Sequence, residues 1–175
     1  MYSEHHRKEK QRLASRRYRE RKPKPVPKIM AIPEIPLSEL SWSAGLFEGE
    51  GTVSIAGGGK RPYTRMFVSV TSTDFDVVKF FIDRWPGQLT ETKSIKNRNA
   101  RPFWTWRRSC RKAEVFLSQL LPLIRTRRVR EKILLALKVQ ASRSPGTKGN
   151  LESYRAMQNG FKREMQVLNR RGNRS

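Results

Sequence analysis

Apolar positions in residues 38–141 follow two alternating spacings, which predict a succession of strands and helices. In residues 52–56 and 65–72 every second side chain is apolar, the period of a strand with one buried face. In residues 75–85 the apolar side chains recur every three or four positions, which is typical of an amphipathic helix. Asp74 precedes that helix and is its expected N-cap.

The same spacing predicts further elements on both sides. A helix is expected to begin near Ser38 or Ser41, which offer caps, and to end at Gly51 in a left-handed conformation. Pro122 is expected to interrupt a later helix. The remaining expected elements are two strands and three helices, at residues 88–96, 103–109, 111–124, 127–141 and 151–169.

In residues 38–141 the resulting order, α-β-β-α-β-β-α-α, indicates an α+β domain with an antiparallel sheet. One face of each strand is apolar and the other carries Thr, Ser, Arg and Lys. We therefore expect helices to cover the apolar face and a curved, polar face to remain open to a ligand. A polar, basic surface of this kind is suited to reading DNA grooves.

Composition divides the chain into three zones. Residues 1–30 hold eleven Lys or Arg against three Glu, and the stretch 22–28 is rich in proline, so we expect a basic arm and linker. The arm faintly resembles a leucine-zipper basic region, but no heptads follow it. Residues 38–141 form the expected main domain, and residues 150–170 form a C-terminal helix that packs on it or extends from it.

Charge gives the first indication of function. The 175 residues include 38 Lys or Arg and 15 Asp or Glu, a net charge of +23, which favours nucleic acid as the partner. The single cysteine fits a reducing compartment. Without an apolar segment of membrane length or a secretion signal, we expect no membrane association and a location in the cytoplasm or nucleoid of a bacterial or phage-infected cell, or in an organelle.

An acidic pair in the stretch WSAGLFEGEG stands out from this basic background. Glu48 and Glu50 lie where the first helix of the domain is expected to end. A carboxylate beside DNA phosphate requires a divalent cation between them, and Mg²⁺ is commonly held by one or two carboxylates plus phosphates. Metal-assisted phosphodiester hydrolysis is the chemistry that follows. Small residues on the same helix, Ala44, Gly45 and Gly49, predict close packing against another helix.

The stretch AGLFEGEG at residues 44–51, followed by β-β-α-β-β-α, resembles the motif of the LAGLIDADG homing endonucleases. The resemblance covers residues 38–140 and implies the αββαββα LAGLIDADG fold, a nuclease activity and Mg²⁺. It implies that Glu50 is the metal ligand, together with the backbone carbonyl of Gly49. It also implies that Glu48 is structural and caps a neighbouring helix.

Two further positions follow from the resemblance. The family places a lysine just beyond an L-P-x-L stretch, and LLPLIRTRR at residues 120–128 has Arg127 there. Arginine stays charged, so Arg127 can orient or stabilise but cannot take part in proton transfer. Ser72 matches a water-positioning residue at the end of the second strand.

The chain contains one motif, which in this family implies a homodimer that pairs its motif helices through Ala44, Gly45 and Gly49. Two Glu50 carboxylates would then serve a pseudo-palindromic double-stranded DNA target, in an intron-encoded setting. Half of a heterodimer is the alternative assembly. The alternative functions are a non-cleaving maturase that binds its own intron RNA, a DNA-binding regulator, and a general RNA-binding protein.

Strand parity predicts which side chains face DNA bases. Arg65 and Arg107 are the expected guanine readers, because a guanidinium matches the acceptors of guanine. If Trp104 and Trp106 faced the groove, Arg108 would replace Arg107. Arg98 and Arg101, in the loop between the last two strands, are expected to contact phosphate. The remaining base-facing candidates are Thr52, Ser54, Ser69, Lys93 and Thr105.

Overall fold

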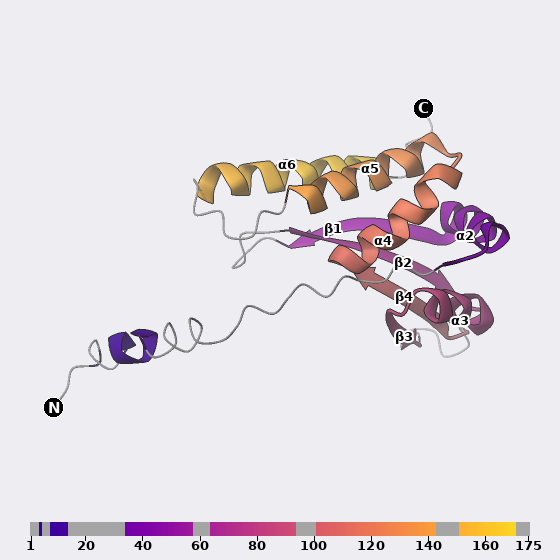
Figure 1. The fold of residues 1–175 in the computed structure, drawn as a ribbon, viewed down its shortest axis with the longest axis horizontal. Coiled ribbons are helices and arrows are strands. Elements are labelled where there is room, and N and C mark those ends of the chain that lie inside the picture. Colours follow the sequence, from indigo (N-terminus) through magenta and orange to yellow (C-terminus); the bar gives the residue numbers. More distant parts are fainter. Residues whose placement is uncertain are drawn as a thin grey trace. The chain divides into compact units, whose positions relative to one another are not determined.

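The computed structural model describes residues 4, 8–13, 34–57, 64–93, 101–142 and 151–170. The chain divides into two compact units, Met1–Ala31 and Ile32–Ser175. In the first unit, residues 8–13 are helical. The second unit contains the sheet, and the description below concerns it alone (Figure 1).

The second unit has the predicted order of elements. The sequence expectation of an α+β domain is therefore confirmed. The helices and strands are α2 (Leu37–Glu50), β1 (Gly51–Gly57), β2 (Thr64–Ser72), α3 (Phe75–Arg84), β3 (Gln88–Thr92), β4 (Phe103–Ser109), α4 (Cys110–Leu120), the 3₁₀ turn η1 (Leu121–Leu123), α5 (Arg127–Ala141) and α6 (Leu151–Asn169).

The four strands form one antiparallel sheet in the order β1-β2-β4-β3. Alternation along β1 and β2 buries one face of the sheet, with Val53, Met66, Val68 and Val70 at most 2% exposed. Helices α4, α5 and α6 lie over this apolar face (Figure 1). The opposite face carries the polar side chains, as the alternation predicts.

Five aromatic side chains form the centre of the core: Phe47, Phe81, Trp85 directly after α3, Trp106 and Phe116. The ring centroid of Phe116 lies 4.9 Å from that of Trp106 and 5.0 Å from that of Trp85. The indole of Trp106 donates to the carbonyl of Trp85 over 2.9 Å, so the buried N–H is satisfied. This cluster fixes α2, α3 and α4 against the sheet.

Polar contacts attach α6 to the domain. Gln158 is buried and bonds to the hydroxyl of Thr64 on β2, while its amide donates to Ser142 over 3.2 Å. At the other end of α6, Asn169 donates to the carbonyl of Val53 over 3.1 Å. The C-terminal helix therefore packs on the domain.

Three local expectations were wrong. Gly51 is not left-handed, since its φ is −79° and its ψ 147°. A Cβ there would lie 2.3 Å from the Phe47 carbonyl, so glycine is required for close approach. No serine side chain caps α2, whose N-cap is Pro36. Finally, β3 ends at Thr92, earlier than the predicted residue 96.

Candidate nucleic-acid interface and metal site

The polar face of the sheet aligns several predicted base-facing residues. Strand pairing places Thr52, Ser69, Arg107 and Gln88 in one row across all four strands. In a parallel row, Ser54 lies beside Phe67. A row of side chains across a twisted sheet can follow successive bases of a groove.

A second row consists of threonines, of which Thr105 alone was a predicted candidate. Thr71, Thr105 and Thr90 are cross-strand neighbours, and the hydroxyls of Thr71 and Thr105 lie 3.0 Å apart. Hydroxyls can donate to or accept from base edges. The polar parity of β2 would have identified Thr71, whereas Thr90 follows only from the register of β3 against β4 in the structure.

Arg107 lies on the polar face, and its guanidinium carbon is 4.2 Å from the ring centroid of Phe67. This cation–π contact holds the long side chain against the sheet. Trp106 is fully buried and Trp104 partly so, which places Arg108 on the apolar side. Arg107 therefore lies on the polar face of the sheet, on the side that strand parity predicts.

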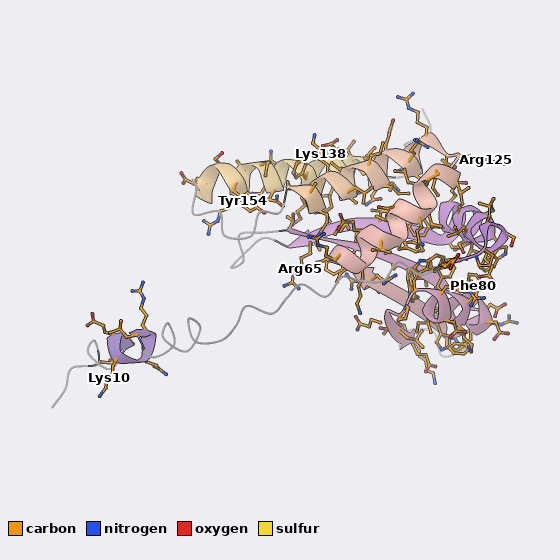
Figure 2. The ribbon with its side chains drawn as sticks, in the orientation of Figure 1. Lys10, Arg65, Phe80, Arg125, Lys138 and Tyr154 are labelled. Carbon is orange, nitrogen blue, oxygen red and sulfur yellow. The ribbon has the colours of Figure 1, made fainter. Side chains whose placement is uncertain are left out.

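Other predicted DNA contacts are placed differently. Lys93 follows the end of β3 on the side of Leu89 and Glu91, whose cross-strand neighbours are the tryptophans of β4, and its Nζ lies 3.4 Å from Glu91. The register thus places Lys93 on the side opposite the polar rows, one residue beyond the end of β3. Arg98 lies outside the described residues, whereas Arg101 is exposed next to β4. Arg65 lies opposite Ala56 on the polar face of β2, the side that parity predicts, and Figure 2 shows it near one end of the strands.

Glu50 is the last residue of α2, and β1 begins at the next residue. Its side chain is exposed. Because the helix ends there, the Gly49 carbonyl has no intrahelical donor. One carboxylate and one carbonyl are oxygen ligands of the type that Mg²⁺ prefers, but they are too few for its octahedral shell. Among the described residues no three His, Cys, Asp or Glu side chains form a metal-binding group.

Glu48 faces another helix. Its Oε1 accepts a hydrogen bond from the Arg125 amide over 2.8 Å and another from the Thr126 amide, just before α5 begins. Burial raises the pKa of the Glu48 carboxyl, but the hydrogen bonds from Thr126 and Arg125 together outweigh it, and the pKa lies below its ordinary value. Glu48 thus caps the N-terminus of α5, where the N-cap residue Thr126 makes no side-chain capping hydrogen bond.

Because folding lowers the pKa of Glu48, its contribution to stability is complete above the ordinary value of 4.5 and disappears as the pH falls through the lower folded value. We expect Glu48→Ala to lower the free energy of unfolding by about 1 kcal/mol at pH 7. Urea titrations at several pH values should show this difference shrinking below pH 4.5. The exposed Glu34, replaced by alanine, serves as the control, and a difference that grows in acid would contradict the capping role.

The other two residues that the resemblance assigns to catalysis have local partners. Arg127 begins α5, its side chain is 93% exposed, and its Nε donates to Glu131 over 2.8 Å. The Ser72 hydroxyl accepts from the Asp74 amide over 3.0 Å in the turn before α3. Neither contact buries the side chain.

The predicted helix-pairing surface is only partly available. Ala44 is 1% exposed and belongs to the core, so its assignment to a dimer interface was wrong. Its small side chain instead lets α2 pack against the rest of the domain. Gly45 and Gly49 are exposed, and a Cβ at either would meet no atom within 4 Å. These two glycines form an exposed strip of small residues on α2.

In the part of the chain that the structure describes, no helix has both the length and the apolar character needed to span a membrane.

Comparison with known proteins concerns the fold. No family model and no curated protein sequence matches the chain. The solved structure of the homing endonuclease I-CvuI, in complex with its target in the presence of 2 mM Ca, is similar with a TM-score of 0.60 and 16% identity, over 79% of this chain and 86% of that one. At this identity the likeness shows the fold, and the predicted LAGLIDADG fold is confirmed.

Two further solved structures have lower TM-scores. The archaeal intron-encoded homing endonuclease I-Vdi141I, complexed with DNA, has a TM-score of 0.44 and 14% identity over 71% of this chain and 96% of that one. The LAGLIDADG homing endonuclease I-GzeII, in complex with a DNA target, has a TM-score of 0.48 and 17% identity. The match covers 93% of this chain and 52% of I-GzeII.

Proposed function

We propose that the protein is a site-specific DNA endonuclease that cleaves both strands of a long, pseudo-palindromic target as a homodimer, with Mg²⁺ as cofactor. The observation that carries this proposal is the position of Glu50. The carboxylate ends α2 directly before β1, so it adjoins a sheet face lined by Thr52, Ser69 and Arg107. The similar I-CvuI structure holds its DNA target, which supports duplex DNA as the substrate here.

A homodimer follows from the small number of ligands in one chain. Glu50 and the Gly49 carbonyl supply two oxygen atoms, and the remaining ligands are expected from the Glu50 of a second copy, from scissile phosphates and from water. The exposed strip at Gly45 and Gly49 allows two α2 helices to approach closely. When bound, the metal stabilises negative charge on phosphate and activates water.

The protein's own residues position the DNA around this centre. The polar rows of the sheet align bases, and Glu48 fixes the end of α2 against α5 through the amides of Arg125 and Thr126. Arg127, the first residue of α5, stabilises negative charge on phosphate without exchanging protons.

The alternative to a nuclease, a non-cleaving chain of the same fold, rests on the identity of Arg127. Arginine cannot act as a proton carrier, and a chain that has lost this step would bind nucleic acid without cutting it, as a maturase acting on its own intron RNA or as a DNA-binding regulator. Incubation with DNA that contains the uninterrupted insertion site, with and without Mg²⁺, distinguishes a nuclease from a chain that only binds. Mg²⁺-dependent double-strand cleavage is the expected result, and sequence-specific binding without cleavage would favour the alternative.

Arg107 gives a prediction about specificity. Replacing Arg107 by alanine is expected to weaken binding by about 1–3 kcal/mol and to relax the preference at one base pair, because a bidentate contact to guanine is lost. Arg101→Ala is the matched control, since loss of a phosphate contact should weaken binding to all sequences equally and lower the salt slope by about 1. Binding to a randomised duplex library measures both effects. An unchanged base preference in the Arg107 variant would show that Arg107 does not contact a base.

A further inference from the structure

Arg108 is a buried cation with two unsatisfied nitrogens among the described residues. It is 7% exposed, and among the described residues neither its Nε nor its Nη1 has a hydrogen-bond partner. Burial lowers the pKa of its guanidinium, which is the expected cost of removing this charge from water. An unpaired buried charge is strongly destabilising, and such charges in proteins are normally paired. In the part of the chain that the structure describes, no group therefore pairs with these two nitrogens of Arg108.

A cavity of about 230 Å³ lies beside Arg108. It is located where β4 ends and β3 begins, and it is lined by Phe67, Gly87, Gln88, Arg107, Arg108, Ser109 and Lys112. Three of these side chains are cationic and none is acidic. The cavity is thus a strongly positive site of sufficient size for a small oxyanion.

The first turn of α4 forms another wall. The helix has eleven residues and starts at Cys110, immediately after β4 (Figure 1). Ser109, its N-cap residue, makes no side-chain capping hydrogen bond, and the first turn contains no acidic residue. Free amides at a helix N-terminus bind anions, and the helix dipole adds to the attraction.

Gly87 adds to the enclosure by bringing the backbone close to β4. A Cβ at this position would lie 2.7 Å from the Arg107 carbonyl and 3.1 Å from Cγ of Arg108. Only glycine allows this approach, so the residue before β3 helps to enclose Arg108.

We propose that this cavity binds one phosphate group of the DNA backbone, through the Arg108 guanidinium, the Lys112 ammonium and the first amides of α4. This assignment rests on the proposed binding of duplex DNA. Ser109 pairs with Phe67 on β2, whereas β1 begins opposite Val70, so the cavity lies about 10 Å along the strands and two strands across from the end of α2. The phosphate is therefore different from the scissile one and anchors the outer part of the target.

The first test uses inorganic phosphate as the probe, with chloride at equal ionic strength as the reference. Phosphate at low millimolar concentration should raise the Tm of the full chain and shift the amide NMR signals of residues 109–112. Arg108→Met should have a Tm in chloride at least as high as the unmodified protein, since it removes an unpaired buried charge, and should lose the phosphate-dependent rise. A rise retained by Arg108→Met would mark a general salt effect and overturn the proposal.

Lys112→Gln and Arg111→Gln form a matched pair that does not disturb the core. Both residues are exposed in the first turn of α4, but Arg111 does not line the cavity and its Nη1 lies 3.8 Å from Glu114. Lys112→Gln should weaken phosphate binding about tenfold, the value of one charge-assisted hydrogen bond. Arg111→Gln should leave phosphate binding close to that of the unmodified protein, and equal effects of the two variants would overturn the site.

A duplex of random sequence identifies the source of the phosphate. Titration with this DNA should shift the same four amides, and Lys112→Gln should lower the salt slope of binding by about 1. Amides that respond to inorganic phosphate and not to DNA would overturn the assignment to the backbone. Cleavage does not enter these measurements. A protein that passes them and fails to cut DNA would lose only the proposed nuclease function, and one that cuts DNA without a phosphate response would lose only this site.

Discussion

Replacing Glu50 by glutamine is expected to lower DNA cleavage at least ~1000-fold while leaving DNA affinity nearly unchanged. Glutamine has the shape of glutamate but lacks the charge that holds a divalent cation against phosphate. The side chain is exposed at the end of α2, so its replacement removes no packing and should not alter the fold. The effect should therefore fall on the chemical step.

The measurement is single-turnover cleavage at saturating protein, with binding followed separately in Ca²⁺. Glu91→Gln provides the matched control, because it removes one carboxylate from the exposed edge strand β3. This control should cleave like the unmodified protein. Cleavage by Glu50→Gln at the unmodified rate would exclude Glu50 as a metal ligand.

Truncating Phe116 to alanine should produce the largest loss of stability, about 3–5 kcal/mol. The ring is fully buried, with centroid distances of 4.9 Å to Trp106, 5.0 Å to Trp85, 5.2 Å to Phe47 and 6.1 Å to Phe81. Its removal leaves a cavity among large rigid rings, which cannot close around it easily. Contacts between α2, α3, α4 and the sheet are all weakened at once.

Chemical denaturation with urea measures this loss, and Val167→Ala supplies a surface control. Val167 is 65% exposed on α6, so its truncation should change the free energy of unfolding by less than about 0.5 kcal/mol. A loss below about 1 kcal/mol for Phe116→Ala would show that the aromatic cluster is not the main source of stability.

Much of the fold could be predicted because the side chains buried in the structure are those that the apolar spacing of the sequence indicates. The alternation in residues 65–72 matches a strand whose Met66, Val68 and Val70 are fully buried, and Asp74 caps α3 by accepting from the Asp76 amide. In these segments the tertiary environment demands the same pattern that the local sequence favours. The order of elements followed from such segments.

The sequence could not reveal features that depend on neighbours from other elements. Ala44 is a small residue of the kind found where two helices pair, yet it is buried within its own chain because α2 packs there against the core. Lys93 was assigned to a strand that ends one residue earlier. Strand register and end points depend on pairing partners, which local spacing does not specify.

Arg108 illustrates the same limit within the candidate site. Strand parity alone places it opposite Arg107, on the side of the two tryptophans, but says nothing about partners for a buried guanidinium. That it lines a cavity with Lys112 depends on the tight junction between β4 and α4, where Cys110 has a positive φ of 53°. Only the assembled fold brings these charges together.

Disulfide cross-linking at Gly45 tests the central claim, that the α2 helices of two copies meet at one catalytic centre. The variant Gly45→Cys is made with Cys110→Ser, so that each chain carries one cysteine, and a second variant places the cysteine at Leu134, which is 48% exposed on α5. A disulfide requires Cα atoms within about 7 Å, so mild oxidation should link the Gly45 variant into a covalent dimer and leave the Leu134 variant monomeric on a denaturing gel. No covalent dimer at position 45, or equal linking at both positions, would contradict the pairing of α2 helices on which the proposed nuclease depends.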